Sequence, residues 1–189
     1  TLAGTRQLMD AEGGEAKVTG YEDLIESLTL PDPNDRHVLA AAIKAGADYI
    51  ELDVIISKDS QVVVTHEPWF NPNTCTSPEG NAITKRTKNN LHKLTYAEIK
   101  KYDCGKRGNK KFPQQAKMEE YKPLLSEVIE TMEAFTKENN LPPVKYNIEI
   151  KNNKFGDGKY NFDTKITSAL IYNVIKKYSI NDRIIIQSF

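Results

Sequence analysis

The feature that most constrains the fold of this 189-residue chain is an alternation of short β-rich runs with segments of helical length. The β-rich runs are dominated by Val, Ile and Tyr and are bounded by Gly, Asp, Pro or Asn, which is typical of strands. The segments between them repeat apolar residues at helical spacing. Such alternation predicts parallel strands joined by right-handed crossovers, and therefore an α/β fold. The expected strands are YIELDVIIS (49–57), QVVVTHE (61–67), VKYNIEIK (144–151) and DRIIIQSF (182–189), and the expected helices are 35–47, 121–140 and 162–180.

Residues 68–121 interrupt this alternation with a long polar stretch, whose one helical candidate is TYAEIKKY (95–102). Loops of this length in a compact domain are usually functional. We interpret the stretch as an insertion that caps or shapes the strand ends; a surface excursion without a role is the alternative. Its Cys75 and Cys104 either remain ordinary thiols or form a disulfide, and no CxxC or Cys/His pattern indicates zinc or redox chemistry.

Charge and length exclude several classes of protein. Lys plus Arg equal Asp plus Glu at 26 each, so the positive field that holds a nucleic-acid backbone is missing and no nucleic-acid partner is expected. No apolar run approaches the roughly 18 residues of a membrane span. A complete (β/α)8 barrel needs about 250 residues, so a TIM-type barrel in this chain must be partial.

Polar residues, three of them acidic, alternate with apolar ones along two of the expected strands. Side chains in a strand point to opposite faces in turn, so Glu51 and Asp53 share one face. The same alternation puts Asn147, Glu149 and Lys151 on one face of the strand at 144–151. Acids on the inward face of a helix-covered sheet need a partner because an unpaired buried carboxylate is costly. Three carboxylates favour a divalent cation, Mg²⁺ or Ca²⁺.

A histidine and a lysine complete this constellation. His66 lies at the end of its expected strand, where barrel enzymes hold their chemistry, and its imidazole can transfer protons near neutral pH. Lys151 offers a positive charge to an anionic substrate. Cation, ammonium and imidazole together suit the cleavage of a small-molecule phosphodiester.

These residues also carry a family resemblance. GADYIELDVIISKDSQVVVTHE (46–67) resembles the signature of the glycerophosphodiester phosphodiesterases, and the match continues through HEPWFNPNTC, LTYAEIKKYDCG, KPLLSEVIE, YNIEIK and DRIIIQSF. The resemblance implies a TIM-type barrel that uses a divalent metal to hydrolyse glycerophosphodiesters to glycerol 3-phosphate and an alcohol. It implies that the metal ligands are Glu51, Asp53 and Glu149. It further implies that His66 is one of two catalytic histidines and that Lys151 faces the substrate phosphate.

The beginning of the chain departs from this pattern. The family's first strand carries His-Arg-Gly followed by Glu-Asn-Thr, and residues 1–48 contain neither. They instead resemble the C-terminal part of a PIN-domain nuclease, in which Asp35 corresponds to a metal-binding acid. His37 is the nearest substitute for the missing histidine, but helical spacing places it outside a barrel. The chain is therefore predicted to be chimeric, with a PIN-like segment at 1–48 and a partial barrel at 49–189 that is incomplete at both ends.

Three functions follow for such a chain. The favoured one is glycerophosphodiester hydrolysis, impaired because the loss of one proton-transfer group typically costs about 10²–10⁴-fold. A non-catalytic fragment that retains only metal binding is the alternative, and a PIN-type ribonuclease is less favoured. Open barrel edges allow self-association. The resemblance implies a periplasmic or secreted location, although no signal peptide is present in this sequence.

Overall fold

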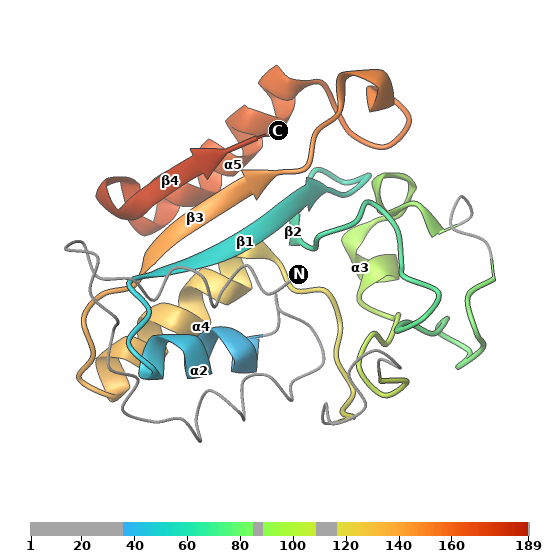
Figure 1. Cartoon of the computed structure of the whole chain (residues 1–189). Coiled ribbons are helices and arrows are strands. Elements are labelled where there is room, and N and C mark those ends of the chain that lie inside the picture. The colour runs from blue at the N-terminus through green and yellow to red at the C-terminus, as the bar shows by residue number, and fades with distance from the viewer. Residues whose placement is uncertain (1–35, 85–88, 109–116, 189) are drawn as a thin grey trace.

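The computed structural model describes residues 36–84, 89–108 and 117–188. The chain forms one sheet with helices packed against it and a loop-rich extension beyond one end of the sheet (Figure 1). The predicted elements are all present within their expected ranges, although those expected at 61–67, 95–102 and 182–189 span only about half of them. The strands are β1 (Tyr49–Ile56), β2 (Val62–Val64), β3 (Lys145–Ile150) and β4 (Ile184–Gln187); the α-helices are α2 (Arg36–Lys44), α3 (Tyr96–Ile99), α4 (Leu125–Glu138) and α5 (Thr164–Tyr178); the 3₁₀ turns are η2 (Leu91–Lys93), η3 (Lys154–Gly156) and η4 (Asn181–Arg183).

The strands lie in the order β2-β1-β3-β4. β1, β3 and β4 are parallel, and α4 and α5 lie in the connections between them. This arrangement confirms the predicted α/β class with parallel strands. β2 is the exception because it runs antiparallel to β1. Only residues 57–61 separate the two strands, and a parallel connection needs about a dozen residues or more.

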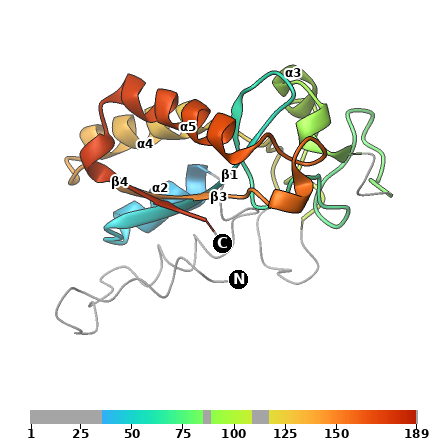
Figure 2. The same cartoon turned by 90° about the horizontal axis from the view of Figure 1, so that it is seen from above.

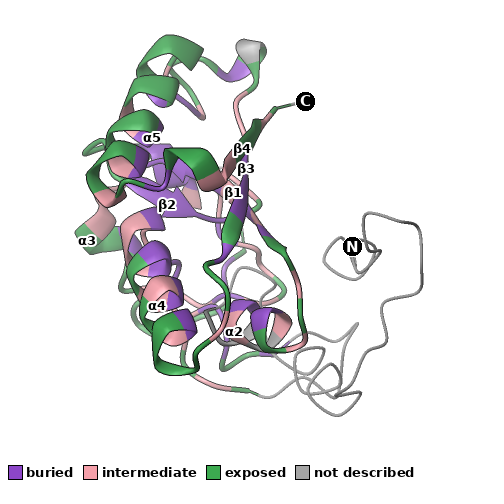
Figure 3. Cartoon of the chain, turned by 90° about the vertical axis from the view of Figure 1, so that its left-hand side faces the viewer, coloured by how far each residue is buried: buried purple, intermediate pink, exposed green. Residues whose placement is uncertain are grey.

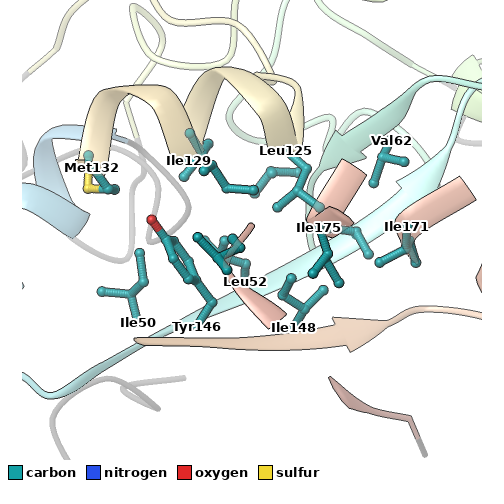
Figure 4. Packing of buried hydrophobic residues seen from close by; sticks show 14 of the residues in the cluster. Ile50, Leu52, Val62, Leu125, Ile129, Met132, Tyr146, Ile148, Ile171 and Ile175 are labelled. Atoms are coloured by element: carbon teal, nitrogen blue, oxygen red, sulfur yellow. The ribbon is translucent and has the colours of Figure 1, made fainter. Parts of the chain in front are cut away.

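The helices α2, α4 and α5 cover one face of the sheet (Figures 2 and 3). Alternate strand residues such as Leu52 and Ile148, both with no exposed surface, point into this layer and belong to one buried cluster with residues of α4 and α5, among them Ile129 and Ile175 (Figure 4). Tyr146 is also fully buried there, and its hydroxyl donates a 2.8 Å hydrogen bond to Glu133. This apolar face is the main core of the domain.

Helix ends are defined by local hydrogen bonds. Asp163 caps α5, since its carboxylate accepts a 3.0 Å hydrogen bond from the backbone N–H of Ile166. Thr95 and Glu98 form a reciprocal capping box at the start of α3. The cap at Asp163 fixes the start of α5, which covers the sheet, and the capping box fixes the start of α3 in the insertion.

The insertion has a small core of its own. Phe70, Leu91 and Ile99 are fully buried in it, and they pack with Ile55 of β1 and Val63 of β2. A disulfide joins Cys75 to Cys104 within this core, so of the two alternatives for the cysteines the structure contains the cross-link. The insertion is therefore anchored on β1 and β2 and cross-linked within itself.

Across the described ranges, no helix is both long enough and apolar enough to cross a membrane.

Candidate active site

The candidate site lies on the face of the sheet opposite the main core. Glu51 and Asp53 alternate along β1 with the buried residues of the apolar face. In the parallel register, Asp53 is paired with Glu149 of β3, and Glu51 is paired with Asn147. Glu149 and Asn147 are both 8% exposed. Two neighbouring strands thus bring three carboxylates and one amide side chain to one surface.

Lys151 directly follows the last residue of β3, and its side chain lies against the acids of this surface. Its Nζ lies 3.0 Å from Oδ1 of Asp53 and also forms an ion pair with the carboxylate of Glu149. Burial opposes the charge of this ammonium, but hydrogen bonds and ion pairs with Glu149 and Asp53 outweigh burial and raise the pKa of Lys151 above its ordinary value. Lys151 is therefore a charged group held between two acids.

Glu51 has a different kind of partner. Nε2 of Gln187, at the end of β4, donates a 2.7 Å hydrogen bond to Oε1 of Glu51. Sequence analysis did not single out Gln187. The signal was a polar residue that ends the otherwise apolar strand IIIQ, but its relation to Glu51 depends on β4 lying beside β3.

The donor chemistry of this surface fits a hard divalent cation. Carboxylate and amide oxygens are the ligands that Mg²⁺ and Ca²⁺ prefer, and the carboxylates outnumber the single ammonium. The buried Oδ1 of Asn147 has no hydrogen-bond partner among the described residues, although buried polar atoms are nearly always paired. Within the same ranges, however, no three His, Cys, Asp or Glu side chains are close enough together to hold a metal ion. The metal-ligand roles of Glu51, Asp53 and Glu149 stay predictions.

His66 lies just beyond β2. Because β2 runs against β1, the chain after Val64 turns back along β1, and the backbone N–H of Thr65 donates a 2.8 Å hydrogen bond to the carbonyl of Asp53. His66 follows at this level, and its side chain is exposed to solvent. Its backbone is therefore near the acidic strand, while its catalytic role stays a prediction.

The other histidines differ from His66. His92 is 6% exposed, its Nδ1 lies 3.3 Å from the carbonyl oxygen of Ile56, and its ring meets the ring of Phe162 edge-on at 4.5 Å. Burial lowers the pKa of His92, so this histidine is a neutral packing residue. The side chain of His37, like Asp35, lies outside what the structure describes.

The insertion contacts the loop that follows β3. Nδ2 of Asn90 donates a 2.6 Å hydrogen bond to the carbonyl of Lys159, and Nζ of Lys93 donates one of 2.7 Å to the carbonyl of Gly158. The rings of Trp69 and Tyr160 meet edge-on at 6.3 Å. These contacts join two loops that both follow strands of the site, while a role of the insertion in shaping substrate binding stays a prediction.

Parallel strands with helices on one face and a row of acids on the other define the class of this protein as a partial TIM-type (β/α) barrel. Solved structures support this fold. A Silicibacter pomeroyi protein assigned as a glycerophosphoryl diester phosphodiesterase superposes with a TM-score of 0.72 at 21% identity, over 87% of this chain and 55% of its own. An Oleispira antarctica phosphodiesterase in complex with its product sn-glycerol-3-phosphate gives a TM-score of 0.60 at 23% identity, over 87% and 54% of the two chains.

The sequence model of the glycerophosphoryl diester phosphodiesterase family matches residues 37–189, and the chain belongs to this family. A glycerophosphodiester phosphodiesterase of Bacillus subtilis is 29% identical over 151 residues, which are 78% of this chain and 44% of the relative. The chain thus spans about half the length of the relatives it matches. The family match begins inside α2 and overlaps the segment 1–48, whose resemblance to PIN-domain nucleases stays a prediction.

Proposed function

We propose that this chain carries the metal-binding part of a phosphodiesterase that hydrolyses glycerophosphodiesters to glycerol 3-phosphate and an alcohol. The observation that carries the proposal is the polar row on β1 and β3, in which Asp53 and Glu149 are register partners that share the ammonium of Lys151. Membership of the family and the product bound to the Oleispira antarctica relative support the choice of substrate.

In this proposal, a divalent cation is bound by Glu51, Asp53 and Glu149, with Mg²⁺ and Ca²⁺ as candidates. Such a cation would stabilise the charge that develops on the phosphoryl oxygens. Lys151 contributes a second positive charge and orients the phosphodiester anion toward the acidic row. Its place between Asp53 and Glu149 puts that charge directly beside the proposed ligands.

His66 is the proposed proton-transfer group. Hydrolysis adds water to phosphorus and breaks the bond between phosphorus and the alcohol oxygen, so one proton leaves the water and one reaches the alcohol. His66 can serve one of these transfers, since it is exposed and directly follows Thr65, whose backbone N–H bonds to the carbonyl of Asp53. The family pattern uses two histidines, and residues 1–48 offer no His-Arg-Gly motif. We therefore propose that this chain alone is slower than a two-histidine enzyme by about 10²–10⁴-fold.

The decisive test is hydrolysis of glycerophosphocholine with added Mg²⁺ or Ca²⁺. Glu51→Gln should abolish the metal-dependent rate, because it removes a charged ligand of the cation. Glu138→Gln is the matched control, since Glu138 is an exposed carboxylate at the end of α4, and it should leave the rate unchanged. Equal, metal-independent rates in all three proteins would remove the assignment. A metal-dependent rise in melting temperature without hydrolysis would instead support a non-catalytic, metal-binding fragment.

A further inference from the structure

Gln187 belongs to the same row of side chains as the proposed ligands. Its register partner on β3 is Glu149, and the partner of Glu149 on β1 is Asp53. Alternate residues of parallel neighbours project to the same side of a sheet, so the three side chains share the polar face. The amide of Gln187 donates its hydrogen bond to Glu51, which is the residue before Asp53 on the same face of β1.

The partner of Glu51 differs in charge from the partner of the other two acids. Asp53 and Glu149 share the ammonium of Lys151, whereas the 2.7 Å bond from Gln187 is the one hydrogen bond that Glu51 receives within the described residues. A neutral amide fixes the orientation of a carboxylate without cancelling its charge. It occupies Oε1 and, among the described residues, leaves Oε2 without a hydrogen bond.

We propose that Gln187 is a positioning residue, whose amide holds Glu51 in the orientation in which this carboxylate binds the divalent cation. The inference rests on the function proposed above and adds a residue on the third parallel strand to the site. Metal-binding carboxylates are usually held by such outer partners, whose loss costs about 10–100-fold in metal affinity.

The test measures Mg²⁺ and Ca²⁺ affinity by calorimetry, in the absence of substrate. Gln187→Met keeps the length of the side chain and removes the N–H donor, so it should weaken cation binding by about 10–100-fold. Gln187→Asn keeps the amide on a shorter side chain that no longer reaches Glu51, and it should also weaken binding. This second variant tests the inference if the methionine variant does not fold.

A double-mutant cycle separates positioning from a general structural effect. Gln187→Met should have no further effect on cation affinity in a Glu51→Gln background, because the group that it positions is then uncharged. Arg183→Met is the control for a loosened β4. Arg183 precedes this strand and holds Glu133 with a 2.8 Å ion pair, so its loss should lower the melting temperature and leave cation affinity unchanged.

The outcomes distinguish the two proposals. If the unsubstituted chain binds no cation, or if Glu51→Gln does not weaken binding, both the proposed function and the positioning role are overturned. If Glu51→Gln weakens binding but both Gln187 variants bind normally, the positioning role alone is wrong. It is also wrong if Gln187→Met weakens binding equally in both backgrounds, since Gln187 then acts independently of Glu51.

Discussion

The two faces of β1 and β3 have opposite requirements, although they are built from alternating residues of the same strands. On the apolar face, Leu52 and Ile148 have no exposed surface and are covered by helices of the described chain. On the polar face, Glu51 and Glu149 meet an amide and an ammonium, and the amide oxygen of Asn147 has no partner in the described part of the chain. Helices cover the apolar face, whereas the polar face has a buried amide oxygen without a hydrogen-bond partner among the described residues.

Residues that stabilise the core and residues of the candidate site therefore alternate along the same strand. Moving one position along β1, from Leu52 to Asp53, crosses from the core to the candidate site. Substitutions at these neighbours should therefore have different consequences, the first for the free energy of unfolding and the second for cation binding.

The largest effect is expected on the apolar face. Leu52→Ala leaves a cavity under α4 and should reduce the free energy of unfolding by about 2–5 kcal/mol, as measured by urea denaturation. Cation affinity of the folded protein should not change, because Leu52 points away from the acids. Asp53→Asn is the paired comparison: it should weaken cation binding, and because it also removes an ion pair with Lys151, it should lower stability by less than Leu52→Ala does. The separation of the two faces would fail if Leu52→Ala altered cation affinity as strongly as Asp53→Asn.

The disulfide provides the next largest effect. Cys75 and Cys104 are 29 residues apart, and closing a loop of that length stabilises a fold by about 3–4 kcal/mol in the chain-entropy model. Cys75→Ser should therefore expose the insertion core to hydrogen exchange, while α4 and β3 stay protected. The double variant Cys75→Ser/Cys104→Ser should match the single one. Loss of protection across both cores would show that the insertion and the main core unfold as one unit.

Lys151→Met sharpens the comparison on the polar face itself. It leaves the carboxylates of Asp53 and Glu149 beside each other without an ammonium, which should reduce stability by about 2 kcal/mol, less than for a fully buried ion pair because solvent reaches these groups. Excess MgCl₂ should restore the stability, and cation affinity should rise as the competing charge is lost. Lys176→Met, at an exposed position of α5, is the control. Unchanged stability with and without Mg²⁺ would contradict the prediction.

The smallest effect is expected on the pH dependence of stability, through Glu133 at the edge of the apolar face. Burial disfavours the charged form of Glu133, but hydrogen bonds from Arg183 and Tyr146 outweigh burial and hold its pKa below the ordinary value of 4.5. A lowered folded-state pKa contributes stability that is present above the unfolded value and is lost as pH falls through the folded value. Glu133→Gln should therefore flatten the loss of stability below pH 4.5, as followed by thermal melts. A profile as steep as that of the unsubstituted chain would assign the acid sensitivity to other carboxylates.

Much of the fold could be predicted from local sequence patterns. The runs at 49–57 and 144–151 mark their strands because apolar residues alternate with polar ones, and the helix at 162–180 is indicated by its apolar spacing. The family resemblance is confirmed, and so is the parallel direction of β1, β3 and β4. These features depend on residues that are near each other in sequence.

The features that sequence analysis missed or left open depend on distant contacts or on chain direction. Whether Cys75 pairs with Cys104 depends on how a long insertion folds back on itself. The hydrogen bond from Gln187 to Glu51 joins β4 to β1 across β3, and the two residues are 136 positions apart in the sequence. The antiparallel direction of β2 follows from its short connection to β1, which a general rule for alternating strands and helices does not cover.

The tight reversal between β1 and β2 has a consequence for how this chain tolerates changes in length. The pairing of Val54 with Val64 fixes how far the chain has returned along β1 when it reaches His66. One residue added between Lys58 and Gln61 would shift this register by one step and turn each following side chain to the opposite face. Changes in the length of the insertion at 68–121 come after the histidine, so they do not alter the number of residues between β1 and His66. The position of the His66 backbone along β1 is thus determined by a few residues of this hairpin.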